Sequence, residues 1–137
     1  MIDWDSLNAE VIAEFRANRG RVARFGENPL AILHTICANS GEVREIPLVV
    51  VLDGDEMLVF GTKAGSTSHP SWYFDLTAHP RIEIEYGTER FAADVLQLPE
   101  AEARQKVQDQ SRAVPQFAKY VESAAPRVIP VFSITRV

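Results

Sequence analysis

The sequence has little cysteine, a shortage of basic residues and no long apolar run, and each shortage excludes a class of protein. A single cysteine, Cys37, excludes an internal disulfide and suits a reducing compartment. Acidic residues outnumber basic ones by 19 to 14, and the net charge of −5 argues against nucleic acid as a partner. No apolar stretch reaches the ~20 residues of a membrane span, and the acidic amino terminus is unlike a signal peptide. We therefore expect a cytoplasmic protein.

The sequence motifs of metal and nucleophilic catalysis are missing as well. His34, His69 and His79 do not have metal-ligand spacing with one another or with Cys37, so no metal site is predicted. Cys37 ends an apolar segment and is expected to be a buried, inert thiol. The motifs of phosphate-binding loops, dinucleotide-binding folds and serine hydrolases do not occur. If the chain is an enzyme, a cofactor must bring the reactive chemistry.

What is present fits one globular domain, residues 1–137, with 46% hydrophobic and 24% charged residues. A helix is predicted at about 5–18, where Asp5 or Ser6 can cap its start. Its apolar face has residues at helical spacing: Trp4, Leu7, Val11 and Phe15.

Four arginines gather at the end of this helix in an otherwise acidic protein. They are either a solvated helix end or a basic rim for a polyanionic tail or a phospholipid surface, which would place the protein peripherally at a membrane. The four are Arg16, Arg19, Arg21 and Arg24.

Further along, segments with the patterns of β-strands alternate with turn residues. Pro47 indicates a sheet edge or a bulge, and Asp53-Gly54 is typical of a hairpin turn. Glu83 and Glu85 fall on one strand face, which is either a solvated face or an acid pair. The predicted strands are 30–37, 45–52, 56–61, 81–86, 90–98 and 128–137.

Short helices interrupt these strands. Ser68 can cap one helix, which has Pro70 in its first turn and ends at His79. Two more are predicted at 99–111 and 114–124. Five or six antiparallel strands with short helices favour an α+β fold built on a small open or split β-barrel over a sandwich or a doubly wound sheet.

The turn between the third strand and the first of these helices carries a functional signal. Small residues surround Lys63 there, so backbone N–H groups and a cation can face one point, as in an anion site. A polar loop that merely enters a core helix has the same pattern, and the turn alone does not separate the two interpretations.

Two longer stretches resemble the deazaflavin-dependent nitroreductase family. Residues 32–48, ILHTICANSGEVREIPL, match its pattern G-(R/A)-K-(T/S)-G-x-P-R-x-x-P-L at the turn and the following strand. Residues 61–84, GTKAGSTSHPSWYFDLTAHPRIEI, match its pattern (A/S)-S-K-x-G followed by P-x-W-Y-x-N-L. Residues 115–131, PQFAKYVESAAPRVIPV, resemble its aromatic helix and last I-P-V strand. The resemblance runs from about residue 10 to residue 137.

The resemblance implies a split β-barrel of the flavin-reductase/FMN-binding type that binds coenzyme F-420, an 8-hydroxy-5-deazaflavin with a phosphate and an oligoglutamate tail. Members of the family use the reduced coenzyme to transfer a hydride to quinones, nitroaromatics or enones. Carried over, one turn would hold the phosphate and tail, a strand would line the ring pocket, and the second turn would contact the phosphate and ribityl chain, backed by aromatic residues. The first turn has Asn39, Ser40, Gly41 and Arg44, and the strand has Pro47 and Leu48. The second turn has Thr62, Lys63, Ala64 and Gly65, and the residues behind it are Pro70, Trp72, Tyr73 and Asp75.

Two of these positions depart from the family pattern. Asn39 stands where the family usually has a lysine, and Asp75 stands where it has an asparagine. The first removes a cation and the second adds a negative charge near a proposed anion site.

The acceptor pocket implied by the resemblance is apolar and would suit a flat hydrophobic acceptor. Its only hydroxyl belongs to Tyr120, which could orient an oxyanion or relay a proton. The pocket residues are Val49, Val114, Phe117 and Tyr120.

Alternatives remain at this point. Phe117 and Tyr120 could simply pack their helix. The chain could be an FMN- or haem-binding split barrel of the pyridoxamine-phosphate-oxidase type, or a non-catalytic carrier of the deazaflavin. Edge strands would allow a homodimer, as in related split barrels.

Overall fold

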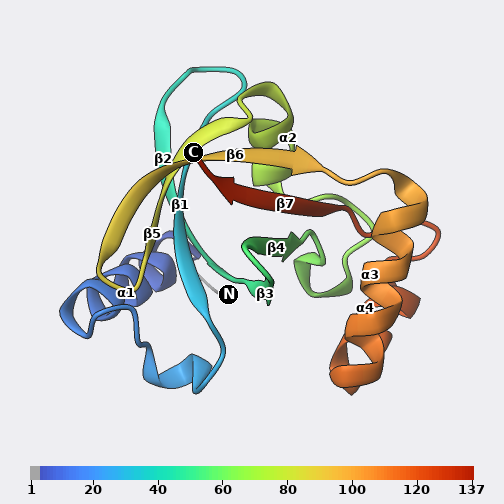
Figure 1. Cartoon of the computed structure of the whole chain (residues 1–137). Coiled ribbons are helices and arrows are strands. Elements are labelled where there is room, and N and C mark those ends of the chain that lie inside the picture. Colours follow the sequence, from blue (N-terminus) through green and yellow to red (C-terminus); the bar gives the residue numbers. More distant parts are fainter. Residues whose placement is uncertain (1–3) are drawn as a thin grey trace.

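The computed structural model describes residues 4–137 and is built around one strongly curled antiparallel sheet (Figure 1). Its seven strands run in the order β2-β1-β5-β6-β7-β4-β3. This is the α+β, barrel-like architecture that the strand pattern predicts. The strands are β1 (Leu30–Ile36), β2 (Val43–Val49), β3 (Val51–Asp53), β4 (Glu56–Phe60), β5 (Arg81–Tyr86), β6 (Glu89–Gln97) and β7 (Val131–Arg136).

The predicted strand at 45–52 is two strands in the structure, which accounts for the seventh. Val50 lies between β2 and β3, is 1% exposed, and donates its N–H to the carbonyl of Pro29 at 2.9 Å. The chain therefore leaves the β1 partner at Val50 and pairs next with β4. β2 and β3 end up as the two edges of the sheet. Pro47 lies on β2, so the predicted edge position is confirmed, and its missing N–H costs no ladder bond there.

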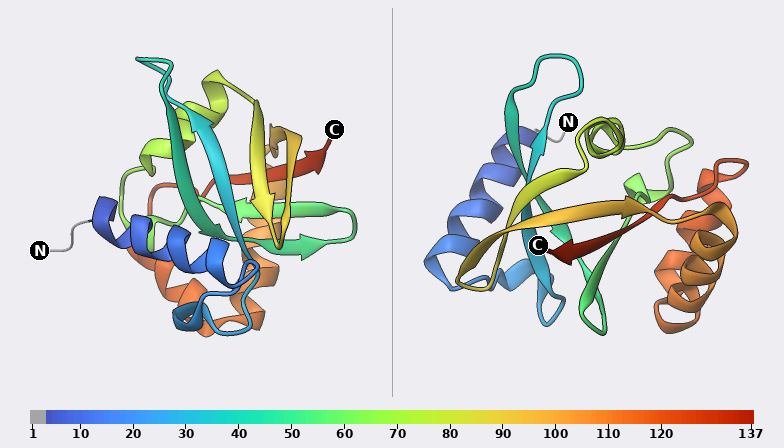
Figure 2. Two further views of the ribbon diagram at one scale, coloured as in Figure 1. Left: turned by 90° about the vertical axis from the view of Figure 1, so that its left-hand side faces the viewer. Right: turned by 45° about the horizontal axis from the view of Figure 1, so that its top comes forward.

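Helices cover the two ends of the sheet. In Figures 1 and 2, α1 packs at one end, while α3 and α4 lie side by side at the other. α2 packs against the sheet between them and contacts β1. The helices are α1 (Trp4–Ala17), α2 (Ser71–Ala78), α3 (Glu100–Ala113) and α4 (Pro115–Ala124), with short 3-10 turns η1 (Ala23–Phe25) and η2 (Lys63–Gly65).

Two capping predictions are wrong. α1 begins at Trp4, so Asp5 and Ser6 lie inside its first turn instead of before it. α2 begins at Ser71 with Pro70 at the N-cap position and no side-chain cap. The hydroxyl of Ser68 instead accepts a hydrogen bond from Lys63. The side chain of Trp4 lies outside the described part of the chain.

The core has three parts that follow this layout. Trp72 and Leu76 of α2 pack on the concave sheet with Phe132 and Ile84. A second cluster lies between α3, α4 and the start of β7. The third holds α1 against β1, with Phe15 only 1% exposed, and burial of such a ring is worth about 2–3 kcal/mol.

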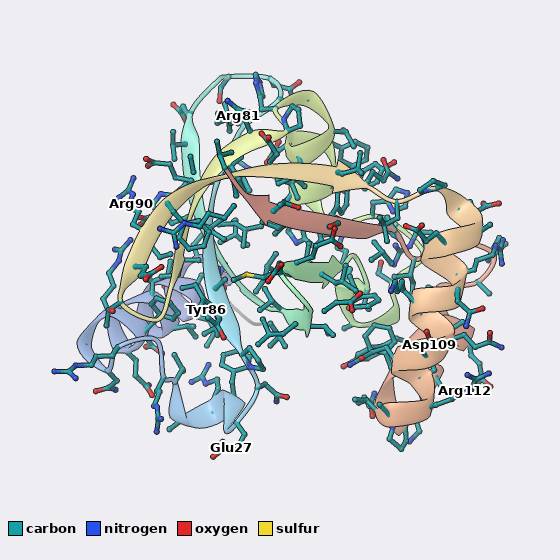
Figure 3. All side chains as sticks on the ribbon, in the orientation of Figure 1. Glu27, Arg81, Tyr86, Arg90, Asp109 and Arg112 are labelled. Carbon is teal, nitrogen blue, oxygen red and sulfur yellow. The ribbon has the colours of Figure 1, made fainter. Side chains whose placement is uncertain are left out.

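Exposed ion pairs mark the outer faces. In Figure 3, Arg81 and Arg90 extend from the β5–β6 hairpin, and Asp109 and Arg112 lie together on α3. Arg90 pairs with Glu83, whose side chain is 53% exposed, so the solvated-face interpretation holds for Glu83. None of the helices in the described part of the chain combines the length and apolar character that a membrane span requires.

Candidate functional site

The Lys63 loop (residues 61–67) has a backbone shaped for an anion. Thr62 is right-handed, with φ −70° and ψ −39°, and it is followed by left-handed residues: Lys63 at φ 46°, Ala64 at φ 52° and Gly65 at φ 81°. A right-handed residue followed by a left-handed one turns successive N–H groups toward one concave side, which makes a nest for negative charge. Positive φ at a lysine and an alanine costs about 1 kcal/mol or more each, so the surroundings must enforce it.

Close packing holds the loop in this shape. A Cβ on Gly61 would meet Cγ of Pro130 at 2.7 Å, and one on Gly65 would meet Cβ of Ser123 at 2.9 Å and Cα of Tyr120 at 3.2 Å. The loop therefore rests directly on α4 and on the segment that leads into β7, and only glycine fits at the two contact points. The predicted turn residues and the late aromatic helix are thus brought together by the fold.

The charges of the Lys63 loop are not cancelled by acids. Lys63 is exposed and donates from Nζ to the Ser68 hydroxyl at 3.1 Å; within residues 4–137 its ammonium has no carboxylate partner. Beneath the loop lies Arg127, a residue that the sequence reasoning did not single out. Its only sequence signal is an isolated arginine between an alanine-rich helix end and an apolar strand. Its guanidinium donates to the loop carbonyls of Gly61, Thr62 and Ser66.

The Ser40 turn (residues 37–44) is the other predicted anion contact. It is closed by N–H bonds from Gly41 to the Cys37 carbonyl at 2.9 Å and from Cys37 to the Glu42 carbonyl at 2.8 Å. Asn39, Ser40 and Arg44 are exposed. Cys37 is buried, as predicted, but hydrogen bonds from the Ser40 hydroxyl and the nearby amides lower the pKa of its thiol.

Asp75 has a different place from the one its sequence position suggests. Its carboxylate is 5% exposed and accepts the N–H of Ala38 at 3.0 Å. The negative charge that departs from the family pattern is therefore used to hold the Ser40 turn against α2. Since the Lys63 loop leads into the start of α2 at Pro70, this helix connects the two turns.

The predicted ring-pocket and backing residues divide between surface and core. Pro47 and Leu48 are half-buried on the edge strand β2, and Leu48 packs against the main core. Trp72 is buried and meets Phe132 edge to face at 5.9 Å between centroids. Tyr73 is half-buried and stacks on His69 at 4.1 Å.

The predicted acceptor pocket is likewise split. Phe117 packs edge to face on Phe60 at 5.1 Å and belongs to the core under α4, so the helix-packing interpretation holds for it. Tyr120 is half-buried, and its backbone touches the Lys63 loop at Gly65. Val49 and Val114 are 41% and 40% exposed, at the end of β2 and between α3 and α4.

A second charged centre, the Arg16 cluster (Arg16, His34, Glu45 and Glu85), was not predicted. His34 Nε2 lies 2.7 Å from Glu85, and Arg16 donates to Glu85 at 2.7 Å and to Glu45 at 2.5 Å. The hydrogen bond from Arg16 lowers the pKa of Glu85 to about 2. The solvated-face interpretation is thus wrong for Glu85, whose side chain is 14% exposed.

The ligand atoms of His34, Glu45 and Glu85 lie within 4.8 Å of one another, a spacing that could suit a metal ion. The Arg16 guanidinium already supplies the cation that these carboxylates attract, so the cluster is a salt bridge between α1 and the sheet. Because Arg16 is used in these ion pairs, it is not available for the basic rim that was one interpretation of the four arginines.

A curled antiparallel sheet of seven strands with helices at its two ends defines the chain as a split-barrel protein, with the cationic nest at the entry of α2. Residues 7–136 match the model of the F420H(2)-dependent quinone reductase family. The chain belongs to this family. A protein of Mycobacterium tuberculosis (strain ATCC 25618 / H37Rv) named as an F420H(2)-dependent quinone reductase is 30% identical over 130 residues, which cover 90% of this chain and 86% of that protein.

Solved structures agree. An F420-H2 dependent reductase (FDR-A) superposes with a TM-score of 0.67 at 29% identity, over 77% of this chain and 93% of that one. A structure described as a domain-swapped dimer has a TM-score of 0.69 at 27% identity, over 96% and 97%. A pyridoxamine 5'-phosphate oxidase-related, FMN binding protein from Nostoc punctiforme has a TM-score of 0.51 at 14% identity, over 100% and 82%, and shows the fold alone.

The residues present fit a coenzyme that carries a phosphate and carboxylates. The fit rests on the nest at Lys63, on Gly65, which lets the backbone approach α4, and on cations that have no acid partner in the described part of the chain. Such groups bind oxyanions through N–H donors and charge together.

Proposed function

We propose that this chain reduces quinone-type acceptors with coenzyme F-420, and that it holds the anionic part of the coenzyme on the Lys63 loop and the Ser40 turn. The observation that carries the proposal is the nest at Lys63, whose cations have no carboxylate partner among residues 4–137, in a chain of the F420H(2)-dependent quinone reductase family. When bound, the reduced deazaflavin supplies a hydride to the acceptor.

The residues of the chain have separate tasks in this proposal. Lys63 and the amides beside it balance the phosphate charge, and Ser40, Gly41 and Arg44 bind the phosphate and tail from the exposed turn. Pro47 and Leu48 offer a half-buried apolar wall for the ring.

On the acceptor side, the Tyr120 hydroxyl provides a donor for an oxygen that gains negative charge as the acceptor is reduced. Val49 and Val114 offer exposed apolar surface, which suits a flat hydrophobic acceptor such as a quinone. Phe117 supports the helix from beneath through its contact with Phe60. Nitroaromatics and enones have the same requirements and belong to the same proposed range.

Parallel titrations with F-420 and FMN, followed by turnover with a quinone panel, test the function. We expect F-420 to bind with a dissociation constant near or below the micromolar range, or about 8 kcal/mol of binding free energy, with FMN at least about a hundredfold weaker. Reduction of quinones should follow addition of reduced F-420. Absence of F-420 binding would refute the proposal, and binding without turnover would assign the chain to the carrier class instead.

We further propose a cytoplasmic homodimer. The relative described as a domain-swapped dimer and the two edge strands β2 and β3 support the assembly, and a single buried thiol suits the compartment. Size-exclusion chromatography with light scattering should give twice the mass of the 15.3 kDa chain; a monomer at micromolar concentration contradicts it.

A further inference from the structure

Arg127 makes an unusually complete set of hydrogen bonds with the Lys63 loop and its flank. Nε donates to Ser66 O at 3.0 Å, Nη1 to Gly61 O at 2.8 Å and His69 Nδ1 at 3.2 Å, and Nη2 to Thr62 O at 2.9 Å and Ser66 O at 2.8 Å. A guanidinium has five N–H donors in a rigid fork. Every donor of Arg127 is therefore used, and four of the five bonds end on loop carbonyls.

These bonds decide which way the loop amides point. In a trans peptide plane, the C=O of one residue and the N–H of the next point in opposite directions. Carbonyls of Gly61, Thr62 and Ser66 aimed at Arg127 therefore turn the N–H groups of Thr62, Lys63 and Thr67 away from it, toward the outer side of the loop. Among residues 4–137 none of these three N–H groups has an acceptor. They are available to a ligand.

The charge of Arg127 also remains available. Its partners are carbonyl oxygens and a histidine nitrogen, and within the described chain no carboxylate pairs with it. Desolvation lowers its pKa, yet a guanidinium stays charged at neutral pH. Asn39 leaves the Ser40 turn without the cation usual in the family, so the half-buried positive charge of Arg127 behind the other turn gains importance.

We propose that Arg127 is a positioning residue of the coenzyme site: its guanidinium draws the loop carbonyls inward, which aims the amides of Thr62, Lys63 and Thr67 at the coenzyme phosphate. Arg127 acts through the loop and does not touch the ligand. This inference rests on the proposed function for the identity of the ligand, but the shape of the loop is a property of the free protein.

The test uses Arg127→Lys in the full chain, which keeps the charge and removes the fork. Exchange of the Gly65 and Ser66 amides, which donate to the carbonyls of Thr62 and Lys63 in the free protein, should accelerate at least about tenfold, while amides of β1 and β5 keep their protection. The F-420 dissociation constant should rise at least about tenfold, with the salt dependence of the wild type, because the charge is still there. Arg90→Lys is the matched control, since Arg90 uses its fork on Glu83 near the β5–β6 turn; it should change neither quantity.

Several outcomes would overturn the inference. Unchanged loop exchange with weaker binding would mean that Arg127 acts by contact or field alone, and faster exchange throughout the sheet would make it a general fold residue. If the loop loosens but the F-420 affinity does not change, Arg127 orders the loop without contributing to coenzyme binding. If wild-type protein does not bind F-420, the proposed function fails separately, and loop exchange still reports whether Arg127 orders the loop.

Discussion

Two arginines with opposite surroundings organise the two ends of this molecule. Arg16 donates to the carboxylates of Glu45 and Glu85, so its charge is cancelled where α1 meets the sheet. Among the described residues, Arg127 donates only to carbonyls and one imidazole, so its charge persists beneath the Lys63 loop. Carbonyl dipoles satisfy hydrogen bonds without removing net charge. A guanidinium paired with carboxylates stabilises the fold but has no net charge left to attract a ligand. A guanidinium bonded to carbonyls also stabilises the fold, and its positive charge can still attract an anion.

The largest expected effect falls on the paired end and depends on pH. The pKa of Glu85 is about 2 against 4.5 for a free side chain. A lowered folded pKa means that the unfolded chain binds the proton first on acidification, so stability falls between pH 4.5 and 2. The loss is up to about 3 kcal/mol by the linkage relation.

Glu85→Gln checks this expectation. Urea unfolding at several pH values should show the variant destabilised near neutrality and less sensitive to acid than the wild type, with F-420 affinity unchanged. Parallel stability curves for the two proteins would show that the Arg16 cluster contributes nothing to acid sensitivity.

At the unpaired end, Lys63→Ala should weaken F-420 binding at least about tenfold, or about 1.4 kcal/mol, because an exposed cation on the nest is removed. The melting temperature should hardly change, since the Ser68 hydroxyl is the one partner of Lys63 Nζ within residues 4–137. Lys106→Ala is the control, because it removes the same charge from the outer side of α3, where Lys106 pairs with Asp53. A fall in stability without a loss of binding would make Lys63 structural.

The smallest effect belongs to Asn39→Lys. A cation restored at the exposed Ser40 turn should tighten F-420 binding about two- to fivefold at low salt, and screening should remove most of the gain at about 0.5 M salt. Asn39→Gln, which changes length without charge, should leave affinity as it is. An affinity for the lysine variant equal to wild type at low salt shows that this turn does not face the phosphate.

Local signals predicted most of the fold. Alternation in 81–86, the hairpin at Asp53-Gly54 and the edge position of Pro47 each depend on near neighbours, and the structure has all three. The break at Val50 escaped prediction because an unbroken apolar run does not reveal that its middle residue bonds to Pro29 instead of a strand. The caps of α1 and α2 were misplaced because several polar residues compete at each helix start.

The candidate site was predictable only in its turn residues. The small residues around Lys63 indicated the nest, but Arg127 reaches that loop from 61 to 66 residues away, and Arg16 meets Glu85 across 69 residues. No spacing rule covers such pairs. Asp75 shows the same limit, because its charge suggested a conflict with an anion until burial and the Ala38 amide accounted for it.

Gly65 lies where the Lys63 loop touches α4, close against the backbone of Tyr120 and the side chain of Ser123. Because no side chain separates them, the loop packs directly on the backbone of α4, so a shift of one requires a shift of the other. The proposed coenzyme half and the proposed acceptor half of the site therefore meet at this contact, where Gly65 packs on the backbone of Tyr120. If a ligand that binds one half rigidifies this contact, a ligand that binds the other half pays a smaller cost in conformational entropy.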